Sequence, residues 1–321
     1  MTIAPGLAGR TLIKGHAAGN DFLLLIDAER ATAVTAGEVA AVCDRRTGLG
    51  ADGLVRLTRT AALPGTEHFR ATVPEAEWFL DYYQSDGAPV VGAGAAYGAA
   101  CLVLAAVLDA EGLEPLTDGA STTIGTRGGA RTVTRLGGLW AVDVGRARRA
   151  ELDGPAADAV REGWDTLVRI PGLEEERAAL SLDLPGRHAV VALGLKAEFD
   201  AAELGPAGAG RTPVYTPAPN AETTLVLTVP LGEHADTVTG ERVGRARVRV
   251  LAPDKVRAGV EACCAAAVAL HEWSGAGAPA DYLLSPPGGE VGVHVGADPL
   301  AQGGALLATA PVELVGRITL I

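Results

Sequence analysis

The chain has 321 residues, of which 48% are hydrophobic and 21% are charged, so it is long enough to bury two ordinary cores and is expected to be globular. A formal net charge of -12, without any run of Lys and Arg, argues against nucleic acid as a partner. The N-terminal stretch lacks the pattern of a signal peptide, so a cytoplasmic location is expected. The four cysteines show no CxxC spacing, and no disulfide, metal ion or cofactor is expected.

In chain order, residues 11–83 are predicted to form mostly strands, because apolar or alternating segments follow one another between Gly, Asp and Pro. These segments read TLIKG, DFLLLID, GLVRLT, HFRATV and EWFLDYY. The clearest helix in this part is expected over residues 35–45. After a turn at residues 85–87, a helix rich in Gly and Ala is predicted from about residue 93.

The uncharged run over residues 90–108 is long enough to be considered as a membrane span. Gly and Ala fill its first half, and Asp86 and Asp109 bracket it. A helix buried on all sides in a soluble core explains this pattern better than a membrane span.

The second half repeats the order of strands followed by one small-residue helix, expected over residues 261–273. The strands that precede this helix read TLVRI, LSLDL, HAVVAL, TTLVLTV and RVRVL. The pattern predicts an α+β protein with two similar domains, each built of strands around a central helix. We expect residues 1–131 together with 312–321 to form the first domain, and residues 132–311 to form the second.

A G-x-G-x-x-G motif at Gly48, Gly50 and Gly53 is typical of a dinucleotide site only where a strand leads into a helix. Here a helix comes before the motif and a strand follows it, so no helix N-terminus is available for a pyrophosphate. The motif is therefore interpreted as a loop without a nucleotide. The chain also lacks a GxSxG elbow, an HExxH helix and a P-loop.

Several segments together resemble the diaminopimelate epimerase family in order and spacing. They are Lys14-Gly15-His16, Gly19-Asn20-Asp21-Phe22, residues 43–53, residues 81–87, Arg187-His188-Ala189-Val190, Pro219-Asn220, residues 265–269 and Gly288-Gly289-Glu290-Val291. The resemblance spans nearly the whole chain and is most specific in its first 110 residues. It implies two pseudo-symmetric domains with the active cleft between them, each domain having a central helix.

The resemblance fails at the two catalytic cysteines. Where the family has a Cys-Gly-Asn-Gly loop before its first central helix, this chain has Ala93-Gly94-Ala95-Ala96. The thiol of the second loop falls on Gly259 or Glu261, depending on the alignment, and Cys263 and Cys264 lie beyond both. Stereoinversion needs an acid and a base on opposite faces of one carbon, so two-thiol epimerisation is not expected.

The substrate-binding positions implied by the resemblance have also changed. A Glu-Arg pair of the family falls on Ala252-Pro253, and an Asn falls on Gly186. Asn20 and Asn220 stand at matching places, and Gln84 stands where an Asn is usual. The loss of polar side chains implies a roomier, less polar cleft and a bulkier ligand.

Glu261 is the candidate catalytic residue, because a carboxyl at a helix start among Ala and Val could have a raised pKa and act as an acid or a base. It could equally be an ordinary helix-start acid that interacts with the helix dipole. His188 could serve chemistry or packing. The candidate substrate-binding residues are Asn20, Gln84, Ala93, Ala95, Tyr97, Arg187, His188 and Asn220.

Three functions remain open from the sequence. The first is a cofactor-independent isomerase or ring-forming cyclase on a larger, less polar, polyketide-like metabolite, acting by Glu261 proton transfer or by templating. The second is an amino-acid epimerase with bases other than cysteine. The third is a non-catalytic binding or partner subunit. The expected partner is a small-molecule substrate without nucleic acid or membrane, and the sequence leaves open whether two copies form a homodimer.

Overall fold

The computed structural model describes residues 3–92, 97–151, 163–204, 212–219, 222–237, 239–251, 259–296, 298–300 and 304–321. The chain divides into two compact units. Unit 1 comprises Met1–Asp143 and Thr309–Ile321, and unit 2 comprises Val144–Ala308. The boundary lies at residue 143, later than the expected residue 131, because a strand hairpin that follows residue 128 continues the sheet of unit 1.

Unit 1 is a sheet with the strand order β18-β1-β2-β3-β4-β5-β6-β7 around a central helix, α3. Its strands are β1 (Thr11–Ala17), β2 (Asn20–Ile26), β3 (Gly53–Arg59), β4 (Trp78–Gln84), β5 (Ser121–Thr126), β6 (Gly129–Leu136), β7 (Leu139–Gly145) and β18 (Val312–Thr319). Its helices are η1 (Pro5–Leu7), α1 (Ala36–Cys43), η2 (Thr60–Ala62), α2 (Glu67–Thr72) and α3 (Gly98–Ala110). The chain end therefore returns as β18 to pair with β1.

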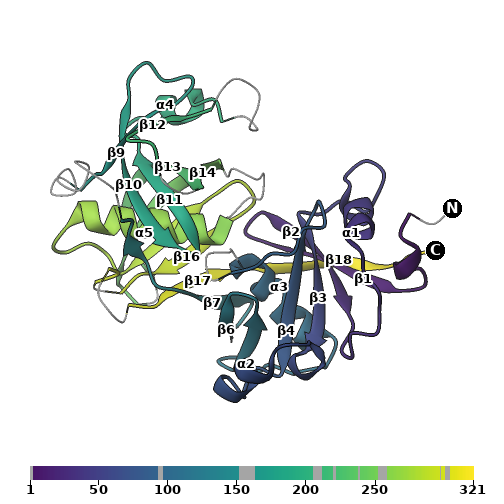
Figure 1. Ribbon diagram of the computed structural model, residues 1–321. Helices are drawn as coiled ribbons and strands as arrows, with labels where there is room; N and C mark the ends of the chain where they lie inside the picture. Colours follow the sequence, from purple (N-terminus) through teal and green to yellow (C-terminus); the bar gives the residue numbers. More distant parts are fainter. Residues whose placement is uncertain are drawn as a thin grey trace. The chain divides into compact units, whose positions relative to one another are not determined.

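Unit 2 is built in the same way around a second central helix, α5, as Figure 1 shows for each unit. Its strands are β8 (Arg148–Arg149), β9 (Thr166–Arg169), β10 (Arg177–Leu184), β11 (Gly186–Ala192), β12 (Val214–Thr216), β13 (Thr223–Ala235), β14 (Arg242–Leu251), β15 (Asp281–Ser285), β16 (Val291–His294) and β17 (Leu306–Ala310). Its helices are α4 (Lys196–Ala201) and α5 (Gly259–Ser274). The strands β9 and β12 form a small extension beside β10.

The pairing pattern shows that the two units repeat one topology. An antiparallel hairpin, β1–β2 or β10–β11, is followed by a parallel pair, β2–β3 or β11–β13, and by an antiparallel pair, β3–β4 or β13–β14. The central helix then crosses to a strand parallel to the last one, which gives the β4–α3–β5 and β14–α5–β15 crossovers. The α+β prediction with one central helix in each half is confirmed.

Both central helices are buried around their circumference. All residues of α3 from Gly98 to Leu108 are buried, as are those of α5 from Gly259 to Leu270. Small side chains permit this, because they let strands approach the helix from several sides. No helix among the described residues is long and apolar enough to cross a membrane.

One expected strand is a helix in the structure. The segment HFRATV was predicted to be a strand, but residues 67–72 form the short helix α2. The ring of Phe69 on α2 lies edge-on to Phe79 of β4, 6.2 Å away. The alternation of polar and apolar residues in this segment predicts a strand. The structure has a six-residue helix instead, whose ring contact with β4 comes from a distant part of the chain.

Candidate functional site

The candidate residues of unit 1 gather at one end of its sheet. In the parallel pair of β2 and β3, Phe22 lies beside Gly53. In the antiparallel pair of β3 and β4, Gly53 lies beside Gln84. The starts of β2 and β3 and the end of β4 are therefore level with one another. Because α3 leaves the end of β4 and leads back to the start of β5, its N-terminus, after Tyr97, belongs to the same end.

The repeat brings the candidates of unit 2 to the corresponding end. His188 of β11 lies beside Thr224 of β13, and Leu225 lies beside Leu251, where β14 ends. The crossover from β14 through α5 to β15 places the first turn of α5, with Glu261, at this end. In each unit, sequence positions that are far apart thus lie at the end of the sheet where the central helix begins.

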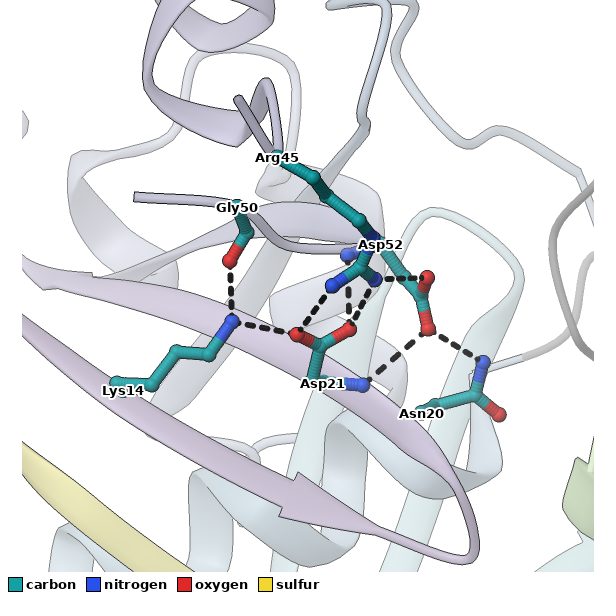
Figure 2. Close-up of polar contacts among 6 residues, drawn as sticks. All are labelled: Lys14, Asn20, Asp21, Arg45, Gly50 and Asp52. Atoms are coloured by element: carbon teal, nitrogen blue, oxygen red, sulfur yellow. Dashed lines mark hydrogen bonds and ion pairs between the residues drawn. The ribbon is translucent and has the colours of Figure 1, made fainter. Parts of the chain in front are cut away.

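Asn20 is held by a polar cluster, which Figure 2 shows. Its Nδ2 donates to Asp52 Oδ2 at 3.1 Å, and the side chain is 3% exposed. Arg45 bridges the two carboxylates of the cluster, at 2.6 Å from Asp21 Oδ1 and 2.8 Å from Asp52 Oδ1. Lys14 Nζ donates to Asp21 Oδ2 at 2.5 Å and to the Gly50 carbonyl.

The contact with Asp52 determines the orientation of the Asn20 side-chain amide. Because Asp52 accepts from Nδ2, the carbonyl oxygen of Asn20 points away from the cluster (Figure 2). The loop with the three motif glycines thus brings Asp52 onto the hairpin of β1 and β2. Sequence reasoning had not assigned this role to Lys14, Arg45 or Asp52, although the motif containing each of them was recognised.

The cluster sets the charge of Asp21. Burial alone would raise the pKa of this carboxyl, but the hydrogen bonds and positive charges of Arg45 and Lys14 outweigh it and lower the pKa to about 2. Asp21 is therefore ionised at neutral pH, and the cluster stays intact.

Tyr97 and Gln84 flank the start of α3. The Tyr97 hydroxyl donates to the Val90 carbonyl at 3.0 Å, and burial raises the pKa of this phenol to about 12. Tyr97 thus remains protonated at neutral pH and ties the two ends of the segment before α3 together. Gln84 is half-buried at the end of β4, where its backbone closes the turn through residue 88.

Glu261 is 2% exposed in the first turn of α5, so the structure places a carboxyl inside the end of unit 2. The four cysteines, Cys43, Cys101, Cys263 and Cys264, are all buried. Burial raises the pKa of Cys43 to about 12, and burial together with the charge of Glu261 raises the pKa of Cys263. These two thiols are protonated at neutral pH.

Arg187 and His188, although adjacent, face opposite sides of β11. The Arg187 guanidinium forms a bidentate ion pair with Asp183 on β10, at 2.7 and 2.9 Å. His188 is 1% exposed and faces the side of the sheet that α5 covers, opposite to the cluster around Phe199. Burial lowers the pKa of His188 to about 4, against smaller opposite effects of a hydrogen bond with the Gly186 backbone and of the Asp183 charge.

The remaining candidates lie outside the described residues. They are Ala93, Ala95, Asn220, Ala252 and Pro253. Within the part of the chain that the structure describes, no group of three His, Cys, Asp or Glu side chains is placed to hold a metal ion.

Comparison with solved structures gives the fold. The chain matches a putative phenazine biosynthesis PhzC/PhzF protein from Clostridium difficile with a TM-score of 0.57, covering 97% of this chain and 99% of that one at 11% identity. It matches a probable proline racemase from Agrobacterium radiobacter with a TM-score of 0.56, covering 97% and 93% at 13% identity. At these identities the likeness shows the fold alone, which this chain shares with both proteins.

Sequence comparison gives the family. A diaminopimelate epimerase from Streptomyces coelicolor is 31% identical over 320 residues, which cover 95% of this chain and 93% of that protein. A diaminopimelate epimerase from Thermobifida fusca is 39% identical over 155 residues, 47% of this chain and 52% of that protein. No family model matches the chain. The chain belongs to the diaminopimelate epimerase family, and its relatives support an isomerase.

Proposed function

We propose that this member of the family is an isomerase that moves a proton with Glu261 instead of a pair of thiols, on a substrate larger and less polar than diaminopimelate. The observation that carries the proposal is the buried carboxyl of Glu261 in the first turn of α5. A positioned carboxylate within reach of a C–H bond is a general base of ordinary strength for such chemistry.

The state of the thiols supports a carboxylate mechanism. A thiol acts as a base only as its thiolate, and burial disfavours that charged form. The raised pKa values of Cys43 and Cys263 leave both protonated at neutral pH. Glu261 is in addition closer to the start of α5 than Cys263 and Cys264 are.

The polarity of the described candidate residues, taken unit by unit, supports a less polar substrate. The guanidinium of Arg187, which could have held a carboxylate, is engaged in its two contacts with Asp183. On the side of unit 1, the described candidates Asn20, Gln84 and Tyr97 are uncharged. Amides and hydroxyls suit the carbonyl and hydroxyl oxygens of an apolar frame better than the charges of an amino acid.

Solvent exchange tests the proposal directly. Purified protein would be incubated in D2O with a panel of ketones, thioesters and amino acids that includes diaminopimelate, and deuterium uptake would be followed by mass spectrometry. We expect uptake into ketones or thioesters on apolar frames and none into diaminopimelate. Glu261→Gln should lower the rate by about 100-fold or more and leave the Kd nearly unchanged.

Glu272→Gln is the matched control, because Glu272 lies on the same helix, where it pairs with Arg149 at 2.6 Å. It should keep the exchange rate. Exchange of diaminopimelate would instead favour an amino-acid epimerase with other bases. Ring closure of a panel compound at an unchanged rate in Glu261→Gln would favour a cyclase that acts by templating.

A further inference from the structure

Asp81 of β4 is a buried carboxylate that two arginines share. It is 0% exposed and lies on the same face of the unit 1 sheet as Tyr83, which packs beside α1; this is called the α1 face. Arg127, in the turn between β5 and β6, donates from Nε to Asp81 Oδ1 at 2.8 Å, and its Nη2 lies 2.7 Å from the same oxygen. The Tyr83 hydroxyl donates to Asp81 Oδ2 at 2.8 Å, and Arg30 Nη2 lies 3.6 Å from that oxygen.

The charges around Asp81 do not balance. Among the described residues, Asp81 is the only carboxylate that forms an ion pair with Arg30 or Arg127. Tyr83 stays neutral at pH 7, because burial and then the charge of Asp81 raise its pKa, against a smaller effect of Arg30. Arg56, beside Asp81 on β3, has a buried acid partner of its own. One positive charge is thus left over on the α1 face, in a chain whose net charge is -12.

Part of each of the two arginine side chains is open to solvent. The exposed fraction is 27% for Arg30 and 30% for Arg127. Both side chains also contact the Tyr83 hydroxyl. A guanidinium carries more N–H donors than one carboxylate and one hydroxyl oxygen can accept. Because Arg30 Nε is buried, only the outer amino groups of Arg30 can reach a ligand.

Arg30 is held in a conformation that lowers the stability of the fold. Its φ is +54°, in the left-handed region that a residue with a Cβ rarely adopts. Its buried Nε has no partner among the described residues, and its distance of 3.6 Å from Asp81 is longer than a hydrogen bond. Backbone and hydrogen-bonding costs that persist together at one residue point to a role other than stability.

The internal repeat shows that the fold does not require this arrangement. Arg56 and Asp81 are paired across β3 and β4, and the equivalent pair of unit 2 is Leu227 with Arg249. There Phe199 of α4 covers the pair, because it packs in one cluster with Leu227 and lies 5.5 Å from the Arg249 guanidinium. Phe199 is 1% exposed, so this place is closed in unit 2. In unit 1 the equivalent place carries the two partly exposed arginines.

We propose that Arg30 and Arg127 bind the carboxylate of a small organic acid on the α1 face of unit 1. A carboxylate brings one negative charge, which balances the positive charge in excess there. Its two oxygens lie in one plane with the carbon between them, which matches the N–H fork of a guanidinium. Asp81 holds Arg127 in place beneath the bound acid.

The site lies on the side of the sheet that faces away from α3. Successive residues of β4 point to opposite faces, so Tyr82 faces away from Asp81. Tyr82 contacts Phe22, and Gly15, the neighbour of Phe22 across the hairpin, lies against Val103 of α3. An acid bound on the α1 face is therefore a second ligand of the protein, and its binding does not depend on the proposed function.

Titration of the whole chain with benzoate tests the site. Benzamide is the neutral analogue of the same shape, and inorganic sulfate is an anion of a different shape. Isothermal titration calorimetry at low ionic strength should show saturable binding of benzoate in the millimolar range, weaker binding of sulfate and none of benzamide. Benzoate at about ten times its Kd should raise the Tm by about 3 °C.

Substitutions of the two arginines separate binding from stability. Arg30→Gly removes one guanidinium and the strained φ but leaves Arg127 on Asp81, so its Tm should stay within about 3 °C of wild type while the Kd for benzoate rises by about tenfold or more. Arg127→Lys keeps the charge without the fork and should raise the Kd by about threefold or more. Arg70→Gln, at an exposed position on α2, is the matched loss of charge and should leave the Kd unchanged.

Four results would overturn the proposal. Wild-type protein that does not bind benzoate, or that binds benzamide or sulfate as tightly, lacks a carboxylate site. Unchanged benzoate binding in Arg30→Gly would show that Arg30 takes no part. Equal weakening in Arg30→Gly and Arg70→Gln would show that benzoate responds only to the overall charge of the protein.

Discussion

Asp21 and Asp52 are two carboxylates that share cations at the start of β2 and β3. Arg45 contacts both of them, and Lys14 contacts Asp21. Two like charges so close together are tolerated because each is matched by opposite charge and by backbone N–H donors. The result is a support for Asn20, whose amide nitrogen donates to Asp52.

The pH dependence of stability should report on this cluster. The pKa of Asp21 is lowered from 3.8 to about 2 in the folded protein. A lowered folded pKa stabilises the protein fully above the unfolded pKa, and this contribution disappears as pH falls from about 3.8 towards 2. Wild type and Asp21→Asn should therefore differ in free energy of unfolding by at most about 2 kcal/mol at pH 6, and by progressively less below pH 4.

Urea unfolding between pH 6 and pH 2.5 measures this difference. Glu75→Asn, at an exposed position, serves as a control that should stay within about 0.5 kcal/mol of wild type throughout. A difference between wild type and Asp21→Asn that does not change over the pH range would show that the cluster contributes through packing and not through charge.

At the level of elements, the start of α3 is fixed by contacts from the turn between β5 and β6. A Cβ atom on Gly128 would lie 2.6 Å from the Gly92 carbonyl oxygen and 2.6 Å from Tyr97 Cε2. To make room for this Cβ, the backbone at Gly92 and the buried ring of Tyr97 would both have to move, which would lower the stability of the fold. The glycine therefore permits the close approach that lets the Tyr97 hydroxyl reach Val90.

Gly128→Ala should lower the free energy of unfolding by about 1–3 kcal/mol and weaken the hydrogen bond between Tyr97 and Val90. Gly138→Ala is the matched control. Gly138 lies in the turn between β6 and β7, and no atom lies within 4 Å of a Cβ added there. It should change stability by less than about 0.5 kcal/mol. Urea unfolding and the fluorescence of the tyrosines would measure both variants, and equal stabilities would contradict the assigned role of Gly128.

The sequence predicted those elements whose pattern of polar and apolar residues is local. It did not predict features that depend on contacts between distant parts of the chain. The long apolar helix α3, the helix α1 and the strands around them follow from local periodicity, and the strand-helix order of both halves reveals the repeat. The helix α2 was misread, because its contact between Phe69 and Phe79 is tertiary. The ion pair of Asp81 with Arg127 and the support of Asn20 by Asp52 were beyond prediction for the same reason, since each joins residues that are far apart in the sequence.

At the level of the whole chain, the C-terminal strand belongs to the N-terminal unit. β18 pairs with β1 over the entire length of β1, from Thr11 with Thr319 to Ala17 with Val312, and it also contacts α3. The Leu320 carbonyl accepts from Gly9 N at 2.8 Å, and Leu320 packs in the core beside α1. The last strand of the chain thus lies at the edge of the unit 1 sheet, next to the first strand.

Removal of residues 312–321 should unfold unit 1 and leave unit 2 folded. Without β18, β1 becomes an unpaired edge and part of α3 is exposed to water, whereas α5 keeps all its contacts with the strands of unit 2. Hydrogen exchange with mass spectrometry should show fast exchange in α3 and β1 and wild-type protection in α5 and β13. Removal of Ile321 alone, which is 99% exposed, should change neither unit. Equal loss of protection in both units would show that they fold as one cooperative body, and unchanged protection of α3 would show that β18 is dispensable for unit 1.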